Sequence, residues 1–193
     1  MEKPILAVDL DGTVGDPYAW LPRVNRIFDL SLTEENFHHL KIRSNQGCQH
    51  VPCDFHKNNK PIFHKDIGMR EGAVETLVRL QERFELIFVT GRTEDLKEIT
   101  EKWFKDYGLS SEFPVVYLGP EMKTIWTDKY KPVAFLEDSV SQSKAISESG
   151  IPVILMDTSY NRSLKGDNII RAMDWKEAEQ ILEKGLYKEK SAC

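Results

Sequence analysis

Short runs of consecutive apolar residues alternate along the chain with segments whose apolar residues recur every three or four positions. The runs are rich in Val, Ile and Phe and are too short for helices, so each predicts a strand buried in a sheet. Strands are expected at residues 5–10, 85–90, 114–118, 133–137 and 152–156. Helices are expected at residues 73–83, 94–107 and 141–149, the last two followed by Gly108 and Gly150. This alternation predicts a doubly wound parallel α/β sheet with right-handed connections.

A long segment, residues 14–70, interrupts the alternation after the first strand, where a bare turn would need only a few residues. Apolar residues at helical spacing predict a helix within 17–30, and Thr33 or Ser31 is placed to cap a second helix that runs to Ile42. We therefore expect a small, mainly helical insertion. The expected division is a core of residues 1–13 and 71–185, an insertion of residues 14–70, and a flexible C-terminal tail of residues 186–193.

Composition limits the classes of function. The 193 residues suffice for one α/β domain with a modest insertion and a buried core. A net charge of −5 disfavours binding to nucleic acid. The chain has no signal-peptide pattern and no apolar run near the ~18 residues that span a bilayer, and its three cysteines do not resemble a secreted disulfide framework. We expect a soluble, cytoplasmic protein, and the sequence leaves open whether it forms a homodimer.

Two acidic residues stand at the end of the first strand. Because side chains alternate along a strand, Asp9 and Asp11 are expected to project to the same side while Leu10 points into the core. Open α/β sheets bind ligands at this edge, and crowded carboxylates need a cation or a shared proton. We interpret the pair as a Mg²⁺ site in which one carboxylate attacks phosphorus and the other moves protons, with Gly12 turning the chain and the Thr13 hydroxyl steadying the nucleophile. The alternative is a pair of acids that caps a turn.

The segment Asp9-Leu10-Asp11-Gly12-Thr13 resembles the first motif of the haloacid dehalogenase superfamily of phosphotransferases. The resemblance implies that Asp9 becomes a phospho-aspartate and that Asp11 is the general acid/base. It also implies that the insertion is a cap, a domain that closes over the site and excludes water.

A second motif is expected where the strand at 85–90 ends in Thr90-Gly91-Arg92. The Thr90 hydroxyl and the backbone N–H groups near Gly91 are placed to bind phosphate oxygens at the same sheet edge as Asp9. Thr90 resembles the second motif of the superfamily. Arg92 is expected either to add a charge-assisted contact to phosphate or to form a surface salt bridge.

The third motif needs a cation to offset two acids and a phosphate. Lys123 follows the strand at 114–118 and begins a short helix near the sheet edge. Lys129 and Lys131 compete, because they lie closer in sequence to the next strand. We favour Lys123 for phosphate binding, because Lys-Thr soon after the third strand resembles deoxyribonucleotidase sequences.

The fourth motif is the pair Glu137-Asp138 after the strand at 133–137. Adjacent acids in this place resemble the metal-binding motif of the superfamily. Mg²⁺ keeps several of its waters, so we expect Asp138 to bind it directly and Glu137 to bind through water, with the reverse order open. Together with the first motif, the candidate metal ligands are Asp9, Asp11, Glu137 and Asp138.

The insertion contains the donor types of a structural zinc site, in Cys48, His50, Cys53 and His56. Their spacing matches no standard finger, and the alternative is a reduced, partly exposed loop. His56 or His64 is alternatively placed to face the substrate phosphate. A further set of aromatic residues offers either a stacking surface for a base or the core of the cap: Tyr18, Trp20, Phe37, Phe55 and Phe63.

The last third of the chain, with Asp157, Tyr160-Asn161-Arg162, Arg171 and Trp175, resembles bacterial proteins similar to the 5′(3′)-deoxyribonucleotidases. The resemblance implies a Mg²⁺-dependent phosphomonoesterase that hydrolyses (deoxy)nucleoside monophosphates through an aspartyl-phosphate. A polynucleotide 3′-phosphatase, whose second motif also carries Gly-Arg, another small-molecule phosphatase and a non-catalytic nucleotide-binding module are the alternatives. The acidic balance favours a small phosphomonoester as the partner, with no membrane and no nucleic acid.

Overall fold

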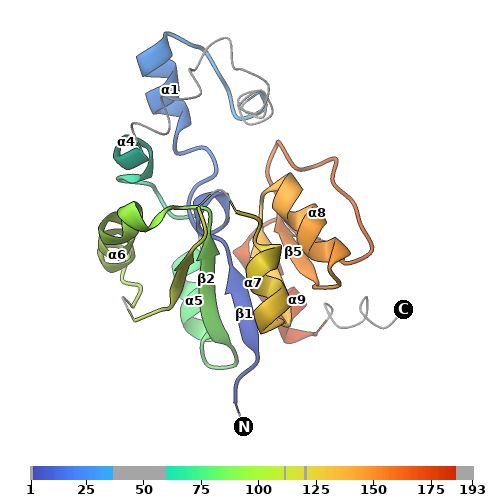
Figure 1. Cartoon of the computed structure of the whole chain (residues 1–193). Coiled ribbons are helices and arrows are strands. Elements are labelled where there is room, and N and C mark those ends of the chain that lie inside the picture. Colours follow the sequence, from blue (N-terminus) through green and yellow to red (C-terminus); the bar gives the residue numbers. More distant parts are fainter. Residues whose placement is uncertain (1, 37–59, 111, 120, 186–193) are drawn as a thin grey trace.

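The computed structural model describes residues 2–36, 60–110, 112–119 and 121–185. Six described strands form one parallel sheet in the order β3-β2-β1-β4-β5-β6 (Figure 1). The strands are β1 (Ile5–Val8), β2 (Glu85–Thr90), β3 (Val115–Tyr117), β4 (Ala134–Glu137), β5 (Val153–Met156) and β6 (Ile169–Ala172). The predicted doubly wound α/β fold is confirmed, with β1 in the interior of the sheet between β2 and β4.

Helices cover both faces of the sheet (Figure 1). One face packs against α5 (Ala73–Leu80), α6 (Lys97–Asp106) and α9 (Trp175–Glu183), and the other packs against α7 (Thr124–Tyr130) and α8 (Val140–Glu148). Alternation within the strands sets this division: Val8 lies in the first core and Ala7 in the second. Both side chains are fully buried, as expected for a strand with helices on each face.

The first strand is shorter than predicted. It ends at Val8, and Leu10–Val14 forms a turn, η1, in which Asp11 and Gly12 have non-helical backbone angles and Gly12 has a φ of +96°. The Gly15 N–H closes this turn by donating to the Leu10 carbonyl at 2.8 Å. Asp9 and Asp11 therefore do not lie on one face of a strand, and the predicted alternation across them is wrong.

The strand β6 and the helix α9 were not expected from the sequence. Asp174 caps α9 by accepting a hydrogen bond from the Glu177 N–H at 2.7 Å. The Trp175 indole N–H donates to the Thr13 carbonyl at 3.2 Å, so α9 holds the turn that follows β1.

The insertion leaves the core and returns to it through two adjacent segments. Gly15 and Met69 form an antiparallel bridge, and the Arg70 N–H donates to the Val14 carbonyl at 2.8 Å. Beyond this neck, the helices α1 (Leu21–Phe28) and α4 (Lys60–His64) lie past the carboxyl edge of the sheet (Figure 1).

The helix expected within 17–30 is present as α1 but begins at Leu21 and ends before Asp29, which has a left-handed φ of +51°. Residues 33–36, expected to begin a second helix, form a turn, and the rest of that helix lies outside the described residues. Across the described part of the chain, no helix combines the length and the apolarity that a membrane crossing needs.

Candidate active site

The ends of three neighbouring strands bring the motifs together. Val8 is paired with Phe88 on β2 and with Leu136 on β4. The next residue along β1, Asp9, donates its N–H to the Leu136 carbonyl at 3.0 Å. Asp9 therefore lies beside the end of β4, where Glu137 follows Leu136.

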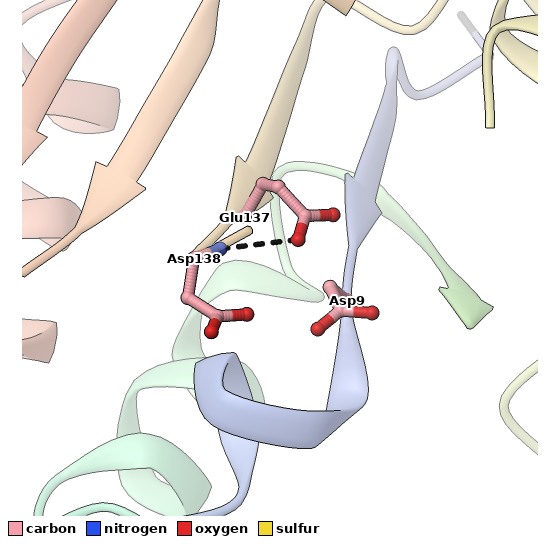
Figure 2. Close-up of side chains that lie close together, drawn as sticks. All are labelled: Asp9, Glu137 and Asp138. Carbon is pink, nitrogen blue, oxygen red and sulfur yellow. Dashed lines mark hydrogen bonds between the residues drawn. The ribbon is translucent and has the colours of Figure 1, made fainter. Parts of the chain in front are cut away.

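Asp9, Glu137 and Asp138 form a buried cluster of carboxylates (Figure 2). One carboxylate oxygen from each lies within 4.8 Å of the others, and none of the three residues is more than 5% exposed. Glu137 is fixed in part by its own turn, since its Oε1 accepts hydrogen bonds from the N–H of Asp138 at 3.2 Å and of Ser139 at 2.9 Å.

Lys123 is the cation that meets this cluster. Its Nζ donates to Asp9 Oδ1 and, at 2.6 Å, to Glu137 Oε2. Lys123 directly precedes α7, and its backbone N–H donates to the Gln142 side chain at 3.0 Å. The competing residues Lys129 and Lys131 are exposed. Of the three lysines, the structure places Lys123 at the site.

The charge of the cluster suits a divalent cation. Burial raises the pKa of Asp9, and the nearby Glu137 raises it further, more than Lys123 offsets. Burial alone would lower the pKa of Lys123, but Asp9 and Glu137 outweigh burial and raise it, so this ammonium stays charged. Three buried carboxylates against one ammonium leave a deficit of positive charge. Mg²⁺ prefers oxygen ligands and would supply the missing positive charge, so the cluster fits this ion.

Three residues from two turns converge on Asp138. The Thr13 hydroxyl donates to its Oδ1 at 3.4 Å, and the Tyr160 hydroxyl donates to its Oδ2. A Cβ on Gly12 would collide with the Asp138 carboxylate and would lie 2.9 Å from the Tyr160 hydroxyl oxygen. Gly12 is thus needed both for its φ and for this close approach. Thr13, expected to steady the nucleophile, instead contacts Asp138.

Asp11 lies outside the carboxylate cluster and pairs with Arg92. The guanidinium donates to Asp11 from Nε at 2.8 Å and from Nη2 at 2.6 Å. His64 Nδ1 of the insertion lies 3.5 Å from Asp11 Oδ1. Burial alone would raise the pKa of Asp11, but the Arg92 guanidinium overcomes burial and holds the pKa well below its usual range.

Arg92 does not have the surface position that one of the two expectations gave it. Its side chain is buried, donates to the Thr100 hydroxyl at 3.0 Å and lies over the Trp103 ring, 4.9 Å from its centre. In this structure its guanidinium therefore faces Asp11, and it forms no surface salt bridge. Thr90 is fully buried at the end of β2, and its hydroxyl accepts from the Arg92 N–H at 3.1 Å.

In the described part of the insertion, aromatic residues pack on one another and on His64, the residue that lies beside Asp11. Trp20 packs edge-to-face on Phe63, with ring centres 5.3 Å apart, and on His64, at 5.5 Å. Phe63 is buried and so belongs to the core of the insertion. Some predicted residues lie outside the described residues: the zinc candidates Cys48, His50, Cys53 and His56, and the aromatic residues Phe37 and Phe55.

Sequence reasoning missed two relationships at the site. It did not connect Arg92 with Asp11, and it used Tyr160 and Asn161 only as part of a resemblance. The Asn161 side chain donates to the carbonyls of Asp138 at 2.9 Å and Met156 at 2.8 Å. No local pattern signals such contacts, because they join residues brought together only by the sheet.

The fold is shared with solved structures of haloacid dehalogenase-like proteins. Among solved structures, the haloacid dehalogenase-like hydrolase SP0104 of Streptococcus pneumoniae superposes with a TM-score of 0.67, covering 93% of this chain and 98% of that one at 12% identity. The likeness extends over most of both chains and shows the fold.

The sequence specifies the family. Residues 3–187 match the family described as 5′ nucleotidase, deoxy (pyrimidine), cytosolic type C protein, and the chain belongs to it. A Halalkalibacterium halodurans protein described as a nucleotidase is 31% identical over 93% of this chain and 92% of its own. A nucleotidase of Clostridium acetobutylicum is 28% identical over 95% of this chain and 96% of its own. The protein is a phosphoric monoester hydrolase of the nucleotidase type.

Proposed function

We propose that this protein hydrolyses (deoxy)nucleoside monophosphates to nucleoside and phosphate, with Asp9 as the nucleophile and Mg²⁺ as the cofactor. The observation that carries the proposal is the position of Asp9. Its carboxylate accepts a hydrogen bond from the Lys123 ammonium and lies beside the Glu137–Asp138 pair, at the carboxyl edge of the sheet. The family and the names of the relatives support a nucleotide as the substrate.

Asp9 and Asp138 would hold the metal directly, and Glu137 would hold it through water. Both oxygens of Glu137 already accept hydrogen bonds, from Lys123 and from two backbone N–H groups, which favours its outer position. Asp11 was a candidate ligand, but its carboxylate is engaged by Arg92, so we place it outside the ligand set. When bound, Mg²⁺ would neutralise phosphate charge and orient the phosphoryl group for in-line attack.

The reaction proceeds by two displacements at phosphorus. In the first, an Asp9 oxygen forms a bond to phosphorus while the bond to the nucleoside oxygen breaks, and that oxygen receives a proton from Asp11. In the second, Asp11 takes a proton from water as the water attacks the aspartyl-phosphate. Phosphate leaves, Asp11 gives up the proton to phosphate or solvent, and both carboxylates are restored for another turnover.

Arg92 positions Asp11 and influences whether its carboxyl group is protonated when the first step begins. In the resting site the guanidinium favours the ionised carboxylate, which is the form that accepts a proton from water. Donation needs the protonated form. A phosphomonoester has a second pKa of about 6, so part of the substrate arrives with a proton that can pass through Asp11 to the leaving oxygen.

The phosphate is gathered by groups at the strand ends. Lys123 supplies the positive charge, and Thr90 with the backbone N–H groups around Gly91 supplies hydrogen bonds beside β1. We propose that Arg92 does not contact the phosphate directly, because its guanidinium donates both of its hydrogen bonds on this side to Asp11. The insertion is proposed to act as the cap that selects the substrate, since His64 brings it to Asp11.

A substrate panel with Mg²⁺ tests the proposal. The panel contains 5′- and 3′-mononucleotides, sugar phosphates and 3′-phosphorylated oligonucleotides, each assayed for released phosphate with the wild type and with Asp9→Asn. We expect mononucleotides to give the highest kcat/KM and Asp9→Asn to release no phosphate. A preference for oligonucleotide ends or for sugar phosphates would contradict the nucleotide assignment. Phosphate release by Asp9→Asn at the wild-type rate would contradict the mechanism.

A further inference from the structure

The turn that follows β5 touches both the acidic cluster and the neck of the insertion. Tyr160 in this turn donates its hydroxyl to Asp138 Oδ2. Its ring packs edge-to-face against Tyr18 of the insertion, with ring centres 6.4 Å apart and an angle of 73° between the planes. Tyr160 thus connects a residue at the entry to the insertion with an acid of the metal-binding motif.

A directed chain of hydrogen bonds joins the same turn to the insertion. The Ser159 N–H donates to the Tyr18 hydroxyl oxygen at 2.8 Å, and the Tyr18 hydroxyl donates to Ser159 Oγ at 3.0 Å. The Ser159 hydroxyl in turn donates to the Glu34 carbonyl at 2.5 Å. Two positions of the insertion, Tyr18 and Glu34, therefore hold the residue that precedes Tyr160.

The other side of the turn is anchored to the backbone of the acid itself. Asn161 is fully buried and its side-chain amide donates to the Asp138 carbonyl at 2.9 Å. Its Oδ1 accepts from the Thr158 N–H at 3.2 Å and from Arg171 at 2.8 Å. Because Tyr160 lies between Ser159 and Asn161, its hydroxyl is held at a fixed place relative to Asp138.

Two hydroxyl groups orient the carboxylate of Asp138. The Thr13 hydroxyl donates to one of its oxygens and the Tyr160 hydroxyl donates to the other. These two contacts, from opposite ends of the core sequence, fix the rotation of the carboxylate about its side-chain bonds. Groups that orient a metal ligand in this way set the affinity of the metal as strongly as many direct contacts.

We propose that Tyr160 is a positioning residue that orients Asp138 for Mg²⁺, and that Tyr18 of the insertion holds Tyr160 in place through Ser159. Mg²⁺ affinity then depends on a contact between the insertion and the core. The inference rests on the proposed function, because that proposal makes Asp138 a metal ligand.

The test measures Mg²⁺ binding to the full chain by titration calorimetry without substrate. Tyr160→Phe keeps the ring and removes the hydroxyl, and we expect it to weaken Mg²⁺ binding by about tenfold or more, as for other groups that orient a metal ligand. Tyr18→Phe is expected to weaken binding by a smaller factor. The double variant should bind like Tyr160→Phe alone, because both changes act on one hydroxyl. Tyr107→Phe, at an exposed tyrosine on the end of α6, is the matched control and should bind like the wild type.

Mg²⁺ affinity of Tyr160→Phe equal to or tighter than that of the wild type would overturn the inference. Full additivity of the two single effects would overturn the route through Ser159. Asp138→Asn separates this inference from the function on which it rests. If Asp138→Asn binds Mg²⁺ like the wild type, the metal assignment fails and the inference fails with it. If Asp138→Asn weakens binding and Tyr160→Phe does not, only the inference fails.

A kinetic readout distinguishes positioning from a loss of structure. For Tyr160→Phe we expect the Mg²⁺ concentration at half-maximal rate to rise by the same factor as the binding constant, with most of the turnover recovered at saturating Mg²⁺. The melting temperature without Mg²⁺ should stay near that of the wild type. A lowered melting temperature together with a rate that Mg²⁺ does not recover would mean a merely structural role and would overturn the inference.

Discussion

The guanidinium of Arg92 holds the carboxylate of Asp11 through two hydrogen bonds, of 2.8 Å from Nε and 2.6 Å from Nη2. Only a planar fork can make both contacts at once, so the proposed acid/base residue has one orientation in the resting site. Two residues of α6 contact the guanidinium as well: the Thr100 hydroxyl accepts a hydrogen bond from it, and the Trp103 ring packs against it. The orientation of Asp11 therefore depends on α6 as well as on the turn that follows β1.

Arg92→Lys tests the importance of this fork. Lysine keeps the charge but loses the paired contacts, so we expect kcat to fall by about 10- to 100-fold through misplacement of Asp11. The free energy of unfolding should fall by about 1–3 kcal/mol, as for lost hydrogen bonds to a charged group. Steady-state kinetics and denaturant unfolding measure the two effects.

The control for this substitution is Arg79→Lys. Arg79 makes the same two-point contact with Glu179, at 2.6 and 2.8 Å, but its side chain is 56% exposed. An exposed pair contributes little to stability because solvent screens it, and we expect wild-type turnover. Equal losses of turnover in Arg79→Lys and Arg92→Lys would refute a special role for the Arg92–Asp11 pair.

Lys123→Met tests the cation of the cluster. Removing the ammonium leaves Asp9 and Glu137 buried without a positive partner, which is expected to cost about 3–5 kcal/mol of unfolding free energy. Turnover should fall below detection, because the phosphate also loses its charged contact. Denaturant unfolding and phosphate release measure these losses.

Two further variants serve as controls for Lys123→Met. The double variant Lys123→Met/Glu137→Gln removes one of the stranded acids, so we expect part of the stability to return but none of the turnover. Lys129→Met, at an exposed lysine on α7, should change the unfolding free energy by about 0.5 kcal/mol or less and leave turnover intact. Turnover in Lys123→Met equal to that in Lys129→Met would exclude Lys123 from the site.

Gly12→Ala tests the close approach between the turn after β1 and Asp138. Gly12 and Gly150 both have left-handed φ values, of +96° and +87°, but only at Gly12 would a Cβ meet the Asp138 carboxylate and the Tyr160 hydroxyl. Gly150→Ala is expected to cost about 1–2 kcal/mol from its backbone alone and to keep turnover. Gly12→Ala should cost more and should lower kcat by about 100-fold or more, because it displaces a proposed metal ligand. Comparable kcat values for the two variants would show that the contact is unimportant.

The sequence was most informative where a residue and its function lie on the same strand. The five apolar runs predicted five of the strands, and the chemistry at their ends followed from the rule that parallel strands present ligand sites at their carboxyl edge. Thr90 and Glu137 each end a strand, as expected. The order β2-β1-β4 then brings both strand ends beside Asp9 without further information.

The sequence was least informative where a side chain is positioned by a distant element. Arg92 and Asp11 are 81 residues apart, and Tyr160 and Asp138 are 22 apart. Neither pair has a local pattern, because its geometry depends on how helices and turns pack on the sheet. By contrast, the helix α9 carried a readable signal, in the cap Asp174 and the apolar residues Ala178, Ile181 and Leu182 at helical spacing.

The extent of β1 was overestimated for a related reason. Leu10 is apolar and fully buried, so it extended the hydrophobic run by two residues beyond Val8. In the structure Leu10 belongs to the same core but reaches it from the turn η1, which the positive φ of Gly12 allows. Burial alone does not distinguish these two backbone conformations.

The account depends most on covalent chemistry at Asp9, and the most direct measurement is rapid quenching of the enzyme with Mg²⁺ and a nucleoside monophosphate, followed by mass spectrometry of the peptides. We predict a phosphoryl group on the peptide that contains Asp9, present during turnover and absent from Asp9→Asn. A phosphoryl group on another residue, or full turnover with no phosphorylated peptide at any quench time, would contradict the account.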